Sequence, residues 1–313
     1  MQSPPDRSRG QLLEALAAGP VGLAALADRT GLSRAAVRDG LDALERAGFE
    51  FRETETGYAV DSVPAYGAGA IEYGLSAPVA VAYHDRLPST NARARELATR
   101  GVSDIAVVAA EQTGGRGRRD RTWASPRGGV WLSILLRPAG SAAHAPVYTL
   151  AGAVAVADAI PDEVAARIKW PNDILVGKRK LAGVLTETAT TGGELDWVIV
   201  GIGVNANVDP TDLPGEDPTS LRAELGLVDR RQLAQRIIER THELAGAPED
   251  ILPAWRRLAD TLGRRVRVET DSETIVGEAV DVTFPGALVV ETPASRRTVA
   301  AGECEPLRPA DPR

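Results

Sequence analysis

The sequence predicts a mixed α/β protein with a small helical module in front of it and a small all-β segment behind it. Three patterns indicate this fold class. Short amphipathic helices fill the first 47 residues, apolar strand-like runs alternate with helical stretches between 79 and 262, and short alternating runs follow Gly263. At 313 residues the chain suits two or three domains better than one.

The N-terminal module is predicted from three helical segments and a hairpin. Apolar residues recur at the three- and four-residue spacing of amphipathic helices in 11–18, 23–30 and 33–47. Gly31 suits the turn before the third helix, and Ser33 suits its N-cap. Apolar and polar residues then alternate around a turn near Gly57, as in a β-hairpin. Residues 1–62 therefore predict a winged helix-turn-helix domain.

The remaining boundaries follow from changes in composition. Residues 63–78 carry prolines and glycines among small residues, which predicts a linker, with room for one short helical turn. Residues 79–262 alternate strand-like runs such as 105–112 with helical stretches at 147–159, 230–246 and 249–262, so we expect a mixed α/β domain. Residues 263–313 predict a small β-barrel.

Charge and residue usage exclude several classes of protein. A formal net charge of −7 argues against general affinity for polyanions, so any contact with nucleic acid must be local. The single cysteine, Cys304, allows no intramolecular disulfide, and the three scattered histidines have no metal-ligand spacing. No apolar run approaches the ~20 residues of a membrane span. We expect a cytoplasmic protein without an export signal, a membrane anchor or a structural metal.

An arginine-rich loop is the first candidate site. Residues 114–121 combine three glycines with closely spaced arginines directly after a predicted strand. Glycines let the backbone approach a phosphate, and the forked guanidinium groups of Arg116 and Arg118 can hold carboxylate or phosphate oxygens at two points. The alternative interpretation is a solvated basic hairpin.

A second candidate combines a lysine with a carboxylate. Residues 169–173, Lys-Trp-Pro-Asn-Asp, end a predicted strand, and Lys180 begins the next one. Taken singly, Asp173 could be a turn residue and Lys180 a solvated lysine. Their proximity in the sequence favours a shared site.

Five blocks in order now make the sequence similar to a known family. They are Ser89-Thr90-Asn91, the stretch from Glu111 to Trp123, residues 169–173, residues 180–185 and residues 201–205. On these blocks the chain resembles the biotin-protein ligases, including bifunctional members that also repress transcription of biotin genes. The resemblance implies an α/β ligase domain at 79–262 and an SH3-like β domain at 263–313.

The resemblance also implies a biotin pocket. Its residues would be Ser89, Thr90, Asn91, Gln112, Gly115, Arg116, Gly117, Arg118, Trp123, Lys180, Gly183 and Gly203. The residue chemistry agrees, because a buried ureido ring needs paired donors and acceptors. The Ser-Thr-Asn block equally suits a helix N-cap, and both roles can hold together. Trp123 would cover biotin as an apolar lid, the alternative being a core tryptophan.

The implied reaction uses biotin, ATP and Mg²⁺ in two steps. The biotin carboxylate attacks the α-phosphate of ATP, and a lysine of a biotin carboxyl carrier protein then attacks the adenylate. Both steps build negative charge on oxygen, which pre-placed cations such as Lys180 and Arg118 stabilise. Asp173 is the candidate that orients and deprotonates the acceptor lysine.

The helix-turn-helix raises the question of DNA binding. Arg34 and Arg38, with Ser33, lie near the start of the predicted recognition helix, where side chains contact the major groove. Residues 1–62 nevertheless hold seven basic and ten acidic side chains, a net charge of −3. If the protein represses, we expect a homodimer on operator DNA with biotinyl-AMP as corepressor.

Two other interpretations stay open at this stage. One is a regulatory DNA-binding protein that senses biotin or its adenylate without catalysis, although such a sensor has no need of Asp173. The other is a lipoate-type ligase, which shares the fold and the adenylate chemistry. The arginine-rich loop together with residues 169–173 favours biotin.

Overall fold

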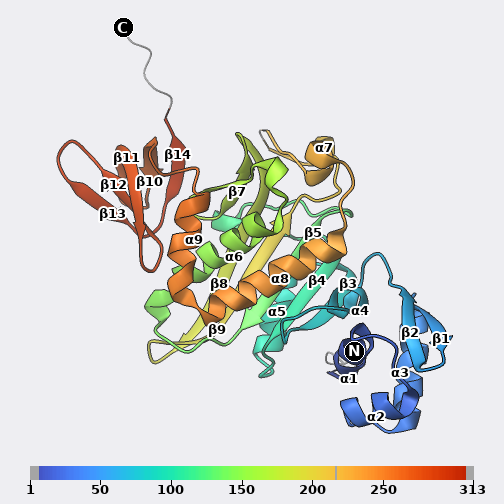
Figure 1. Cartoon of the computed structure of the whole chain (residues 1–313). Helices are drawn as coiled ribbons and strands as arrows, with labels where there is room; N and C mark the ends of the chain where they lie inside the picture. The colour runs from blue at the N-terminus through green and yellow to red at the C-terminus, as the bar shows by residue number, and fades with distance from the viewer. Residues whose placement is uncertain (1–6, 216, 308–313) are drawn as a thin grey trace.

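The computed structural model describes residues 7–215 and 217–307, so the outermost six residues of the predicted N- and C-terminal domains lie outside it. Three parts follow one another along the chain (Figure 1): a small helical module with a hairpin, a central sheet with helices, and a small β sheet. This arrangement confirms the predicted fold class, a mixed α/β domain between a helical module and a small all-β part.

The N-terminal part is a winged helix-turn-helix. Its elements are α1 (Arg7–Ala17), α2 (Leu23–Thr30), α3 (Arg34–Arg46), β1 (Glu50–Thr54) and β2 (Gly57–Ser62). Leu12, Leu26 and Leu44 are buried between the helices, which is why apolar residues recur at helical spacing. The Ser33 hydroxyl caps α3 by accepting a hydrogen bond from the Ala36 amide at 3.1 Å, as predicted.

The segment between the first two parts is packed on both sides. It contains α4 (Ala68–Glu72), whose residues from Gly69 to Glu72 are buried. The Arg9 guanidinium of α1 donates to the Glu72 carboxylate, and Gln235 donates to the backbone carbonyls of Ile71 and Tyr73, at 2.8 Å each. These contacts hold the connecting segment against both the winged helix and the central part.

The central part is a seven-stranded mixed sheet in the order β3-β4-β5-β9-β8-β7-β6. Its strands are β3 (Ala80–Leu87), β4 (Ile105–Gln112), β5 (Val130–Leu136), β6 (Arg167–Lys169), β7 (Asp173–Val176), β8 (Arg179–Thr191) and β9 (Glu194–Val204). Only β3 and β4 are parallel, and each later pair is antiparallel.

Helices cover both faces of this sheet, which explains its continuous apolar strands. The helices α5 (Thr90–Ala98), α6 (Pro146–Ala159), α7 (Leu221–Leu225), α8 (Arg230–Gly246) and α9 (Ile251–Leu258) belong to this part. Ile105 and Val107 of β4 pack with α5, whereas Ala106 and Val108 belong to the core shared with α6. Successive side chains of a strand point to opposite faces, so the two cores alternate along β4. Figure 1 shows α6 and α8 lying across the sheet.

The C-terminal part is one antiparallel sheet in the order β13-β12-β11-β10-β14. Its strands are β10 (Arg265–Glu269), β11 (Thr274–Thr283), β12 (Ala287–Glu291), β13 (Arg296–Val299) and β14 (Glu303–Pro306). Within residues 7–215 and 217–307 the two outer strands, β13 and β14, are not paired with each other. The small β domain is therefore confirmed as a sheet that backbone pairing does not close into a barrel. The Trp170 indole donates to the Gly286 carbonyl at 2.9 Å and joins this sheet to the central part.

Within the described part of the chain, helices are too short or too polar to cross a lipid bilayer.

Candidate active site

A cavity of about 490 Å³ lies where β7, β8 and β9 meet the arginine-rich loop. All but one of the residues predicted for the ligase site line it, although they come from segments up to 114 positions apart in the sequence: Ser89, Thr90, Asn91, Gln112, Arg116, Gly117, Arg118, Trp123, Asp173, Lys180, Gly183 and Gly203. The exception is Gly115, a buried residue of the loop that does not line the cavity. Its carbonyl accepts a hydrogen bond from the Trp123 amide at 2.9 Å.

Glycines form the floor of the cavity beneath Trp123. A Cβ added to Gly203 would overlap the Trp123 indole, and one added to Gly183 would lie 3.2 Å from the same ring. Glycine at these strand positions therefore lets the ring lie directly on the sheet. Trp123 is half-buried, and its indole N–H has no partner among the described residues. A ligand seated on the same glycines requires the ring to move.

One end of the cavity is a cluster of neutral polar groups. Ser89 caps α5 by accepting from the Ala92 amide at 3.4 Å, so the predicted N-cap is present. The Thr90 amide donates to the side-chain oxygen of Gln112 at 2.8 Å, and the Gln112 amide nitrogen donates to Ser125 at 2.9 Å. These bonds fix the orientation of the Gln112 side chain at the cavity wall.

Asn91 continues this cluster below the floor. Its amide nitrogen donates to Glu187 at 2.9 Å and to the Leu185 carbonyl at 3.3 Å, and its oxygen lies 2.6 Å from the hydroxyl of Ser133. Ser133 is fully buried on β5. Ser133 and Glu187 were not predicted, because both lie outside the five sequence blocks.

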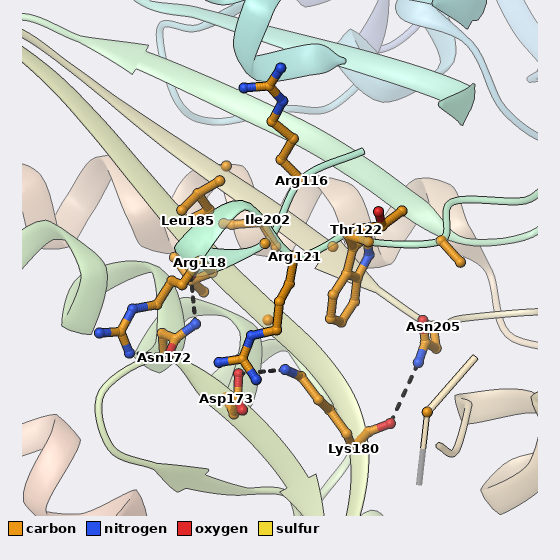
Figure 2. A pocket seen from close by; sticks show the side chains of 18 of the residues that line it. Arg116, Arg118, Arg121, Thr122, Asn172, Asp173, Lys180, Leu185, Ile202 and Asn205 are labelled. Atoms are coloured by element: carbon orange, nitrogen blue, oxygen red, sulfur yellow. Dashed lines mark hydrogen bonds and ion pairs between the residues drawn. The ribbon is translucent and has the colours of Figure 1, made fainter. Parts of the chain in front are cut away.

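The other end of the cavity is cationic. Arg118 donates to the Asn172 side chain at 3.2 Å and to the Gly302 carbonyl at 3.1 Å (Figure 2). Burial lowers the pKa of the Arg118 guanidinium from its ordinary value, and the negative charge of Asp173 opposes this shift. Arg116 is exposed and points away from the centre of the cavity in Figure 2.

Arg121 lines the cavity although no role was predicted for it. It donates to Glu303 of β14 at 2.8 Å, and Arg119 donates to the same carboxylate at 3.2 Å. The hydrogen bond from Arg121 lowers the pKa of Glu303. The C-terminal sheet thus holds the arginine-rich loop at the cavity, a contact between segments more than 180 residues apart that local sequence cannot reveal.

Lys180 is the second cation of this end and forms an ion pair with Asp173. The Lys180 ammonium lies 2.8 Å from the Asp173 carboxylate and 5.1 Å from the centroid of the Trp123 ring. Asn205 donates weakly to the Lys180 carbonyl at 3.5 Å, and its side-chain oxygen is buried without a partner among the described residues (Figure 2). Such an oxygen is available to accept a hydrogen bond from a ligand.

The three residues predicted to contact DNA lie far along the chain from this cavity. Arg34 and Arg38 are exposed on α3, one helical turn apart, and Ser33 precedes them as the cap. Asp42 continues the same exposed face one turn later. This exposed face of α3 therefore carries two arginines in its first two turns, then Asp42, and Arg46 at its end.

Comparison with known proteins decides the family. The chain is 34% identical over 298 residues to the bifunctional ligase/repressor BirA of Bacillus subtilis, a match that covers 90% of this chain and 92% of that protein. The chain belongs to the biotin protein ligase family.

Family models and a second relative also match this biotin protein ligase. Residues 83–205 match the biotin/lipoate A/B protein ligase family, 261–305 the biotin protein ligase C-terminal domain, and 10–49 the IclR helix-turn-helix domain. The biotin--[acetyl-CoA-carboxylase] ligase of Paracoccus denitrificans is 37% identical over 70% of this chain and 97% of its own length.

A solved structure agrees as well. The biotin protein ligase from Aquifex aeolicus in complex with biotin and ATP matches with a TM-score of 0.61 and 26% identity, over 73% of this chain and 99% of that one. The resemblance stated from the five sequence blocks is thereby confirmed.

Proposed function

We propose that this protein activates biotin with ATP to biotinyl-5′-AMP and transfers the biotin to a lysine of a biotin carboxyl carrier protein. One observation carries the proposal. A single cavity has a neutral polar cluster around Thr90 and Gln112 at one end and the cations Lys180 and Arg118 at the other. This polarity fits a ligand with an uncharged, hydrogen-bonding head and an anionic tail, which is the chemistry of biotin.

The polar end suits the ureido ring. Buried Thr90 and Asn91 and half-buried Gln112 offer donors and acceptors in the cavity wall, and Ser89 lies beside them. Leu185 and Ile202 with the glycine floor offer an apolar surface to the rest of the bicyclic ring. In this arrangement Trp123 acts as the lid, leaving Gly183 and Gly203 when biotin enters and then covering it.

The cationic end suits the first chemical step. A carboxylate oxygen of biotin attacks the α-phosphorus of ATP, the bond to the bridging oxygen breaks, and pyrophosphate leaves. Lys180 contacts the carboxylate and the α-phosphate, and Arg118 contacts the phosphate, so the charge that develops on oxygen meets fixed positive charge. Arg116 and Gly117 of the same loop, with the backbone at Gly115, close over the adenylate.

The second step uses Asp173. The amine of the acceptor lysine attacks the biotinyl carbonyl carbon, the bond to the phosphate oxygen breaks, and AMP leaves. Asp173 orients the incoming ammonium group and accepts its proton. Asp173 is placed for this because its carboxylate lines the cavity next to Lys180, the proposed contact of the biotin carboxylate.

Mg²⁺ is proposed to arrive with ATP. Within residues 7–215 and 217–307 the His, Cys, Asp and Glu side chains form no group of three that could hold a metal ion. Mg²⁺ in nucleotide sites is held mostly by phosphates and waters, so the triphosphate of ATP would supply most of its ligands. When bound, the ion neutralises the triphosphate charge.

The winged helix supports a second role as a biotin-dependent repressor. We propose that Ser33, Arg34 and Arg38 contact operator DNA, that the protein binds as a homodimer, and that biotinyl-AMP is the corepressor. The exposed position of both arginines at the start of α3 supports this, whereas the net negative charge of residues 1–62 opposes general attraction to DNA. DNA binding that is indifferent to biotin and ATP would contradict the corepressor role.

The test of the ligase incubates purified protein with ATP, Mg²⁺, labelled biotin and a biotin carboxyl carrier domain. ATP-dependent transfer of label to the acceptor establishes the activity. Biotin binding without adenylate formation or transfer would instead indicate a non-catalytic regulator that senses biotin.

A further inference from the structure

Lys169 is a cation of the cavity that the two chemical steps leave without a role. It is the last residue of β6, and it lies half-buried in the cavity wall. Ile168, the residue before it, is fully buried, and successive side chains of a strand point to opposite faces. Burial raises the pKa of the Cys304 thiol, and the positive charge of Lys169 opposes this rise. The Lys169 ammonium group therefore lies on the side of the cavity that β14 closes.

The Lys169 ammonium group forms no ion pair within the part of the chain that the structure describes. The two carboxylates that line the cavity are bonded to other cations. Asp173 pairs with Lys180 at 2.8 Å, and Glu303 accepts from Arg121 at 2.8 Å. Lys169 thus brings into the cavity a positive charge that no carboxylate in contact with it balances. Partial burial strengthens the attraction between such a charge and an anion.

The strand order separates Lys169 from Lys180 by one strand. The strands β6, β7 and β8 are neighbours in the sheet, and the register pairs Lys169 of β6 with Asp173 of β7. Lys180 belongs to β8, so its backbone lies two strand spacings, or about 10 Å, from that of Lys169. A phosphate chain whose α-phosphate contacts Lys180 can therefore extend across β7 until its far end meets the Lys169 side chain.

The residue type also favours contact with phosphate. The chain has only three lysines, and two of them, Lys169 and Lys180, line this cavity, whereas Lys178 is exposed. Structural ion pairs elsewhere use arginine, as between Arg9 and Glu72. A lysine ammonium is a compact point charge with three donors that rotate freely, so it can follow phosphate oxygens as a bond between them breaks.

We propose that Lys169 binds the β- and γ-phosphates of ATP and stabilises pyrophosphate as it leaves. The inference rests on the proposed function, because it takes ATP as the second substrate. When the biotin carboxylate attacks, the bond from the α-phosphorus to the bridging oxygen breaks, and its electron pair stays on pyrophosphate. Lys169 remains protonated and presents fixed positive charge to this leaving group. It has no part in the second step, since pyrophosphate has then left.

The experiment compares Lys169→Met with the unsubstituted full chain in each half-reaction. Methionine keeps most of the apolar length of the side chain and removes the charge. We expect the KM for ATP and the inhibition constant for pyrophosphate each to rise at least about tenfold, the loss of one hydrogen bond to a charged group. The inhibition constant for AMP, which lacks the β- and γ-phosphates, should stay unchanged. The Kd for biotin should also stay unchanged, and transfer from purified biotinyl-AMP to the carrier domain should not slow.

Lys178→Met is the matched control, because it removes the same charge from an exposed turn outside the cavity. It should leave every one of these quantities unchanged. Pyrophosphate inhibition of Lys169→Met equal to that of the unsubstituted protein would overturn the inference. Slower transfer from purified biotinyl-AMP would overturn it as well and assign Lys169 to the acceptor protein, and an equal loss of affinity for AMP and biotin would assign it to the shape of the cavity.

Failure of the proposed function gives a different result. In that case the unsubstituted protein itself forms no biotinyl-AMP from biotin and ATP, and this inference fails with it. If the unsubstituted protein forms the adenylate and Lys169→Met responds to pyrophosphate as it does, the inference alone is refuted.

Discussion

The Lys180 ammonium lies 2.8 Å from the Asp173 carboxylate, although the strand register pairs Asp173 with Gly183 and Lys180 with Leu175. The register shift between Ile174 and Leu175 accompanies this diagonal approach. The pair joins the residue proposed for the first chemical step to the one proposed for the second. Separating the two steps experimentally therefore separates their roles.

Lys180→Ala should reduce the rate of pyrophosphate release at least about 100-fold, because one pre-placed donor to a developing oxyanion accounts for that magnitude. Lys178→Ala is the control, since Lys178 is an exposed lysine in the turn before β8. Both variants should keep the far-ultraviolet circular dichroism of the unsubstituted protein. Unchanged pyrophosphate release by Lys180→Ala would refute the role.

Asp173→Asn should slow the transfer of biotin from purified biotinyl-AMP to the carrier domain by about 100-fold or more, the range that general-base catalysis supplies. Biotin affinity should change less than about threefold, because the polar end of the cavity is untouched. Single-turnover transfer and calorimetric binding measure the two quantities. A collapse of binding would make Asp173 a structural residue, and Asp212→Asn, at an exposed position, controls for loss of a charge.

Gly203→Ala should displace Trp123, since the added Cβ would overlap the indole. We expect biotin affinity to fall about tenfold. Gly246→Ala is the control, because a Cβ there meets nothing within 4 Å. Combining Gly203→Ala with Trp123→Ala should remove the clash, so the two losses should not add. Additive losses would place the effect of Gly203 elsewhere than on the ring.

Arg34→Ala and Arg38→Ala should each weaken sequence-specific DNA binding by about 1–3 kcal/mol, the discrimination that one bidentate base contact provides. Gel-shift titrations on duplexes selected by the unsubstituted protein from a random pool measure this, with biotin and ATP present. Biotinylation should be unchanged in both variants. A pool that enriches no sequence would argue against a repressor.

Elements with a clear pattern of apolar residues could be predicted from the sequence, whereas some short elements without one could not. The apolar run 105–112 coincides with β4, and the helical pattern 230–246 coincides with α8, where Asp229 supplies the cap. The four-residue strands β7 and β14 were missed, because such short runs show no alternation of their own and are defined only by their pairing, β7 with β6 and β8 and β14 with β10. The helix predicted over 249–262 ends at Leu258.

The residues of the candidate site also differ in whether the sequence could predict them. Contiguous motifs predicted most of the cavity lining, because biotin and phosphate chemistry requires recognisable side chains at fixed local spacing. Arg121, Ser133 and Glu187 were missed because their hydrogen-bond partners lie 42 to 182 residues away in the chain. Tertiary packing brings these partners together, and one sequence carries no local signal of it.

Cys304 supplies a prediction about the closure of the cavity. The thiol is 2% exposed, and burial raises its pKa to about 11, so at pH 8 it stays protonated and shielded, whereas the thiolate is the reactive form. We expect 5,5′-dithiobis(2-nitrobenzoate) to label the native protein at least about 100-fold more slowly than the protein unfolded in guanidinium chloride. Glu303, the residue before Cys304, forms ion pairs with Arg119 and Arg121. Glu303→Gln weakens both pairs and should loosen β14 from the arginine-rich loop, so labelling of Cys304 in the native protein should become faster. Labelling of the native chain as fast as that of the unfolded chain would show that β14 does not hold this side of the cavity closed.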